Sequence, residues 1–276
     1  MGPLKIAFST VASPAWGIEL TMTRATQYGY DGVEVQQVDD EMLGPGISRD
    51  TRRRVLQASQ RGSMPIVCVA TALDVAQPDA AQRAQVIHDS VTMMDIAASW
   101  SAPYVRLYAD PPSGADPTEA LAGAREALAA LATRGRILGV AAVVETRGAF
   151  ATGARVATLL AGAPPDGAGA LWDVAATQRA GEAWQDTISA LGDRLRYVHI
   201  QNGRPNPTAP DGWEPTPLGA GTLPLRDILR ALVAARYDGW LTVAWEKLWR
   251  PELAEPEVAL PQALAEIRGI LKRVGG

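Results

Sequence analysis

Short apolar runs separated by amphipathic stretches recur eight times along the chain. The runs are rich in Val, Ile and aromatic residues, and each is short enough to be a buried strand rather than a helix. They cover residues 4–9, 32–36, 65–70, 103–108, 139–145, 169–173, 196–200 and 240–245.

The stretches between these runs carry helix signals. Asp116, Pro117 and Glu119 suit the N-cap, first and third positions of a helix. Apolar residues recur at helical spacing in three other stretches. These sets are Ile87, Val91 and Met94; Ile228, Leu229, Leu232 and Val233; and Leu260, Leu264, Ile267 and Leu271.

Eight strand-then-helix units without a long hydrophilic linker predict an α/β fold, a single (β/α)8 TIM barrel forming one domain over residues 1–276. The main rival is an open doubly wound sheet, which usually has a glycine-rich turn after its first strand. The first turn here, STVASPAWG (9–17), has no such pattern. A barrel is therefore favoured.

One connection, residues 202–221, is long and crowded with Pro and Gly. It follows the seventh predicted strand, on the edge where barrels carry their active sites. We interpret it as a candidate lid, the alternative being an ordinary surface insertion.

Composition narrows the classes of function. The net charge is −4 and no basic patch is evident, which argues against a nucleic-acid partner. No apolar run is long enough to span a membrane. The chain opens directly into a strand-like run and holds one cysteine, Cys68, so we expect a cytoplasmic protein without disulfides.

Polar residues at the carboxyl ends of the predicted strands are the candidates for chemistry, because barrel active sites lie at that face. They are Glu34 and Gln36, Arg106, Glu145 and Arg147, Asp173, His199 and Gln201, and Glu246. We predict Glu34, Arg106 and Gln201 to contact substrate.

Glu145, Asp173 and His199 follow one another on successive strands. Two carboxylates and an imidazole suit a divalent cation such as Mn²⁺, Mg²⁺ or Zn²⁺, which would offset the repulsion between the acids. The alternative is that each residue forms a separate structural hydrogen bond at a strand end. The other histidine, His88, lies in a helical stretch and is interpreted as a surface residue.

Tryptophans near strand ends are candidate pocket walls, because flat aromatic faces suit sugar rings or other flat ligands. They are Trp16, Trp213, Trp245 and Trp249. Trp213 and Trp245 are predicted to bind substrate. Alternation along the last strand nevertheless places Trp245 on the opposite face from Thr242, Ala244 and Glu246.

Several segments together resemble a known family. The segments are LKIAFSTVASPAW (4–16), GYDGVEVQ (29–36), SAPYVRLY (101–108), VVETRGAF (143–150), WDVA (172–175), YVHIQNG (197–203), LGAG (218–221) and YDGWLTVAWEKLWRPEL (237–253). In this order they are similar to the xylose isomerase-like TIM barrels, the sugar phosphate isomerase/epimerase group. Members of the group often pair, so a homodimer is one expectation, although no segment marks an interface.

The resemblance implies a divalent metal held by Glu, Asp, His and Glu on strands five to eight, with the two glutamates moving a proton beside a carbonyl. Matched to this chain, the first three ligands are Glu145, Asp173 and His199. The fourth position holds Ala244. Other departures from the family's usual residues lie nearby, at Arg147, Ala176, Gln201 and Arg250.

Three hypotheses remain open. The first is a metal-dependent isomerase or epimerase of a small polyhydroxylated metabolite, with Glu145 as base and Glu246 in place of the missing acid. The second is a lyase, dehydratase or cyclase with a three-ligand metal and one base. The third is a metal-free enzyme or binding protein in which Arg147 replaces the cation by pairing with Glu145 or Asp173. A DNA-repair endonuclease is disfavoured by the two histidines and the negative charge.

Overall fold

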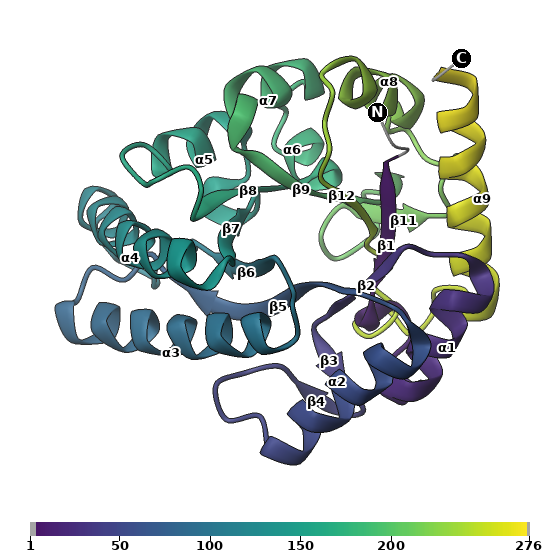
Figure 1. Cartoon of the computed structure of the whole chain (residues 1–276). Helices are drawn as coiled ribbons and strands as arrows, with labels where there is room; N and C mark the ends of the chain where they lie inside the picture. Colours follow the sequence, from purple (N-terminus) through teal and green to yellow (C-terminus); the bar gives the residue numbers. More distant parts are fainter. Residues whose placement is uncertain (1–3, 275–276) are drawn as a thin grey trace.

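Eight parallel strands form a closed barrel in the computed structural model, which describes residues 4–274 (Figure 1). The strands are β1 (Lys5–Ser9), β2 (Gly32–Val35), β5 (Ile66–Asp74), β6 (Tyr104–Tyr108), β7 (Ala141–Glu145), β8 (Ala168–Asp173), β9 (Leu195–Ile200) and β12 (Trp240–Val243). Their order around the ring is β1-β12-β9-β8-β7-β6-β5-β2, and β1 pairs with both β2 and β12 to close it.

The predicted barrel is therefore confirmed, and each of the eight apolar runs forms one of its strands. Strands buried on both faces read as continuous apolar runs, which is why the pattern is visible in the sequence. The main differences lie at strand ends: β5 extends to Asp74, and β12 stops at Val243.

Helices surround the ring (Figure 1). They are α1 (Ile18–Tyr28), α2 (Arg49–Gly62), α3 (Ala80–Ser99), α4 (Pro117–Leu138), α5 (Gly153–Leu159), α6 (Val174–Arg179), α7 (Trp184–Leu191), α8 (Leu225–Ala234) and α9 (Pro256–Val274). Asp116 caps α4 as predicted, because its Oδ1 accepts from the backbone N–H groups of Thr118 and Glu119 at 2.8 and 3.0 Å. Between residues 4 and 274, no helix combines the length and the apolar character needed to cross a bilayer.

The apolar side chains form two cores. The larger lies between the strands and the helices. The smaller lies inside the barrel, and on most strands its side chains follow period-two alternation; Val67 and Cys68 are consecutive, beside a register shift between β2 and β5. Its members are Ala7, Val67, Cys68, Val143, Leu171, Tyr197 and Trp240, with Tyr104 packed against them. This inner layer forms the floor on which the polar residues described below rest.

Two small antiparallel hairpins stand outside the barrel. One pairs β3 (Gln37–Val38) with β4 (Glu41–Met42), and the other pairs β10 (Asn202–Pro205) with β11 (Trp213–Thr216). The second hairpin lies within residues 202–221, so this connection is partly ordered as a sheet rather than an irregular loop. The sequence did not predict these two strands because Pro and Gly, which are abundant here, are depleted in ordinary strands.

Candidate functional site

A polar layer lies directly above the inner core because side chains alternate with a period of two along each strand. Five strands carry a polar residue two positions after a residue of the inner core or one packed against it. The inner residues are Ala7, Tyr104, Val143, Leu171 and Tyr197. The polar residues are Ser9, Arg106, Glu145, Asp173 and His199, all buried. The same strands that build the apolar floor therefore deliver five polar side chains to the barrel mouth.

Glu145, Asp173 and His199 lie together in this layer. Each offers one ligand atom, and these atoms all lie within 4.8 Å of one another. The three residues are 8%, 6% and 4% exposed, so the acids are largely removed from water. Neighbouring buried carboxylates repel unless a cation offsets them, and this donor set of two carboxylates and an imidazole fits a divalent metal.

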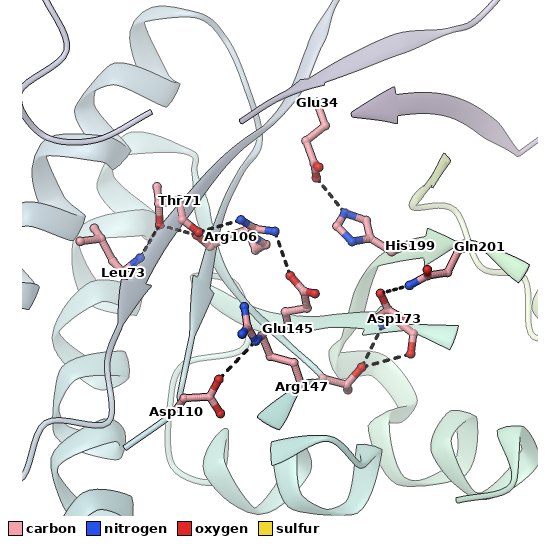
Figure 2. Close-up of polar contacts among 11 residues, drawn as sticks. Glu34, Thr71, Leu73, Arg106, Asp110, Glu145, Arg147, Asp173, His199 and Gln201 are labelled. Atoms are coloured by element: carbon pink, nitrogen blue, oxygen red, sulfur yellow. Dashed lines mark hydrogen bonds and ion pairs between the residues drawn. The ribbon is translucent and has the colours of Figure 1, made fainter. Parts of the chain in front are cut away.

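Arg106 is the cation that contacts this cluster directly. Its Nη1 donates to Oε2 of Glu145 at 3.1 Å, and its Nη2 donates to the Thr71 carbonyl at 2.8 Å (Figure 2). Both side chains of the ion pair are nearly buried. Glu145 is therefore fixed through one carboxylate oxygen, and its Oε1 faces no hydrogen-bond donor among residues 4–274.

Arg147 does not pair with Glu145 or Asp173, which corrects the third hypothesis. Its Nε lies 3.2 Å from Oδ2 of Asp110, and its guanidinium stacks 3.8 Å from the centre of the Tyr108 ring. Arg147 follows the end of β7 and lines the cavity at the barrel mouth, where Asp110 and Tyr108 are its close partners.

Glu34 contacts His199 across the barrel. Its Oε2 lies 2.9 Å from Nε2 of His199, and Glu34 is completely buried (Figure 2). Burial raises the pKa of Glu34, but His199 and Arg106 outweigh it and lower the pKa to about 2. Burial lowers the pKa of His199, but Glu34, Glu145 and Asp173 together raise it to about 9. The sequence predicts a substrate contact for Glu34, whereas its close partner is this histidine.

In EDTA, the free energy of unfolding is expected to fall as the pH rises from about 6.5 to 9. The folded pKa of His199 lies above its ordinary value of 6.5, so its stabilisation is complete below that pH and is lost as the pH passes 9. The folded pKa of Glu34 lies below its ordinary 4.5, so its contribution is lost as the pH falls from 4.5 toward 2.

Thermal unfolding across this range measures the effect. The Glu34→Gln variant should show a shallower decline above pH 6.5, because the carboxylate that raises the pKa of His199 is gone. An equal decline in both proteins would show that this pair does not cause it.

Asp173 serves the fold and the site together. Its Oδ1 accepts from the backbone N–H groups of Ala175 and Ala176, each at 2.9 Å, and so caps α6. Its Oδ2 accepts from the side-chain amide of Gln201. Burial and the Glu145 charge raise the pKa of Asp173. The amide of Gln201 thus orients this carboxylate from the neighbouring strand.

The cluster opens into a cavity of about 1200 Å³. Glu246 and Ala244 line it beside the cluster, together with Trp213, Trp249 and the predicted Gln201. Burial raises the pKa of Glu246, whose Oε2 lies 3.7 Å from Nε of Arg250.

Two of the predicted tryptophan walls lie in the outer core instead of the large cavity. Trp245 lies in the outer core, where its Nε1 donates to the Ala254 carbonyl at 3.0 Å. Trp16 also packs in the outer core and donates to Glu257. Neither lines the large cavity. For Trp245, alternation along β12 already indicated the outward face.

Sequence reasoning missed several residues at the cavity mouth. Asp211, in the connection between β10 and β11, pairs with Arg179 at 3.2 Å and with Arg250 at 2.7 Å. Met42 reaches the same mouth from the hairpin of β3 and β4. Short-range sequence patterns gave no signal for these contacts, because they join loops from distant parts of the chain.

Similar proteins agree with the fold. Fructoselysine 3-epimerase from Escherichia coli O157:H7 is 23% identical over 97% of this chain and 98% of its own length. Among solved structures, a D-psicose 3-epimerase from Clostridium cellulolyticum H10, crystallised with D-tagatose, has a TM-score of 0.78 at 13% identity, covering 98% of this chain and 99% of that one. The 3-keto-D-glucoside 4-epimerase from E. coli has a TM-score of 0.76 at 15% identity, covering 96% and 99%.

The family match extends over most of the barrel. Residues 22–269 match the family described as xylose isomerase-like TIM barrel, and the closed ring of eight parallel strands agrees with that description. The chain therefore belongs to the xylose isomerase-like TIM barrel family.

Proposed function

We propose that this chain is a sugar epimerase or isomerase that moves a proton at a carbon next to a carbonyl. The observation that carries the proposal is the buried cluster of Glu145, Asp173 and His199 at the mouth of the barrel. The sugar epimerases among the similar proteins, named for reactions at carbons three and four, support the same class of reaction.

Glu145 is the proposed base. Arg106 donates to its Oε2 at 3.1 Å, which fixes the carboxylate and leaves Oε1 to accept the proton. Arg106 thus has a positioning role beneath the base, in place of the substrate contact expected from the sequence.

Asp173, His199 and Glu145 would hold a divalent metal. When bound, such an ion supplies Lewis-acid polarisation of substrate oxygens. The hydrogen bond from Gln201 orients Asp173, and the Glu34 contact on Nε2 leaves Nδ1 of His199 as the ring nitrogen for a ligand. A carboxylate on the second ring nitrogen is a common support for ligating histidines.

Glu246 is the proposed second acid. Epimerisation needs the proton to return from the opposite face of the substrate, which requires a second group. Glu246 follows the end of β12 and lines the cavity, and burial raises its pKa, which favours a carboxyl able to give a proton.

A lyase remains the second candidate, favoured by Ala244, which leaves no carboxylate at that wall of the cavity. Incubation with Mn²⁺ and ketoses in deuterium oxide separates the two. Epimerisation places deuterium on the inverted carbon of a product of unchanged composition, whereas elimination gives a product that has lost water. If neither reaction occurs with any of the ketoses and keto-glycosides tested, the proposal is contradicted.

The Ala244→Glu variant is expected to bind Mn²⁺ more tightly, by about tenfold or more, because it adds a carboxylate beside the cluster. Isothermal titration of metal-free protein measures this affinity. Ala180→Glu is the matched control, since Ala180 lines the outer part of the same cavity. Equal affinities in all three proteins would show that Ala244 does not face the metal position.

A further inference from the structure

The cavity is larger than a free sugar needs. Its volume of about 1200 Å³ exceeds the range of about 300–1,000 Å³ in which pockets enclose drug-sized ligands. A monosaccharide reacting at Glu145 would occupy only the inner part. The outer part therefore has room for a second group attached to the sugar.

Two uncovered apolar side chains border this outer part. Trp249 is 52% exposed and Met42 is 42% exposed. Of the five large hydrophobic residues exposed within the described chain, these are the two that line the cavity. Exposed apolar surface beside a binding site commonly marks a ligand-binding groove.

The loop that carries Trp249 is held firmly. Nζ of Lys247 donates to the carbonyls of Pro251 and Leu253, each at 2.6 Å, and to Glu255 at 2.8 Å. The backbone N–H of Leu248 donates to the Val11 carbonyl at 3.0 Å. The backbone is thus fixed while the indole stays uncovered, so little ordering would be needed when a ligand packs on it.

Charged contacts also hold the mouth of the cavity. Asp211 lies between Arg179 and Arg250, and these contacts tie the connection between β10 and β11 to two other loops. Small side chains, Ala175, Ala176 and Ala180, also line the cavity.

We propose that the outer cavity, bordered by Trp249 and Met42, is a subsite for a second ring joined to the reacting sugar. This inference rests on the proposed function and names its substrate class as ring-substituted sugars rather than free monosaccharides. An indole face packs on the flat face of another ring, and a thioether adapts to varied apolar shapes. A second sugar ring and an aryl ring share this chemistry.

Binding of three ketoses to the full chain with Mn²⁺ tests the subsite. The probes are D-fructose, isomaltulose with its attached glucosyl ring, and N-(p-tolyl) fructosamine with its aryl ring. At least one ring-substituted ketose should bind about tenfold more tightly than D-fructose, and the better one identifies the kind of ring. If neither binds more tightly than D-fructose, the subsite is refuted.

Variants assign any gain to the indole. Trp249→Ala should remove the advantage of the ring-substituted ketose, and Trp249→Phe should retain much of it. Ile137→Ala, which removes an exposed hydrophobic residue on α4 away from the cavity, should change nothing. A loss in Trp249→Ala that is equal for D-fructose and the substituted ketose would overturn the proposal.

Two further measurements distinguish a failed subsite from a failed reaction and from a dimer interface. Deuterium incorporation into D-fructose by the unmodified chain tests the reaction separately: its absence would refute the proposed function, whereas the binding measurements above test the subsite. The sedimentation coefficients of the unmodified chain and of Trp249→Ala should be the same. Dissociation of a dimer by Trp249→Ala would assign the indole to an interface between copies and overturn the subsite.

Discussion

Glu145→Gln is expected to lower kcat by about 10²–10⁴-fold, the usual contribution of a positioned general base. Glutamine preserves the size of the side chain and keeps an oxygen for the Arg106 guanidinium, which donates to Glu145 at 3.1 Å in the unmodified protein. What it removes is the charge that accepts the proton. Initial rates on the best ketose, with deuterium incorporation as a second readout, measure the loss.

The matched control is Glu252→Gln, which neutralises an exposed acid on the rim of the same cavity and should retain nearly full activity. Mn²⁺ affinity must be measured in Glu145→Gln, since the same residue is a proposed ligand. A variant saturated with Mn²⁺ and still inactive supports the base assignment. Full activity in Glu145→Gln would rule it out.

Arg106→Met is expected to lower the free energy of unfolding by about 3–5 kcal/mol, because it leaves a buried carboxylate without its partner. The pair joins side chains that are 4% and 11% exposed, on adjacent strands. Denaturation by urea, followed by circular dichroism, measures the loss. Arg134→Met is the control, because its pair with Asp95 is exposed and such pairs contribute about 0–1 kcal/mol.

A double variant isolates the cause of this loss. Arg106→Met combined with Glu145→Leu removes both charges, so it should recover much of the stability lost in Arg106→Met alone. If the double variant is as unstable as the sum of the two single changes, the loss comes from packing of the arginine side chain rather than from the unpaired charge.

The barrel was predictable because its signal is local. Each strand is a short apolar run, and period-two alternation places Glu145, Asp173 and His199 on the inward face of their strands. Parallel strands then bring their carboxyl ends to one edge, so their proximity follows from the fold alone.

The side-chain pairings within the site were not predictable from the sequence, because they depend on the register between strands and on the closing of the barrel. Arg106 and Arg147 were both candidates. The register places Arg106 opposite Val143, two residues before Glu145, and its long side chain reaches the carboxylate from there. Glu34 and His199 are 165 residues apart, and closure of the ring is needed before they meet. The exposed mouth depends on loops, whose contacts leave no periodic pattern in the sequence.

Asp173 both caps α6 and belongs to the candidate cluster, and this affects how the residue changes in evolution. Its carboxylate begins α6, and losing such a cap costs a protein about 1 kcal/mol even when no reaction is involved. In a descendant that has lost the reaction, this aspartate should therefore be retained longer than site residues that have no role in folding. An aspartate at this position in a relative is therefore, on its own, weak evidence that the relative retains the reaction.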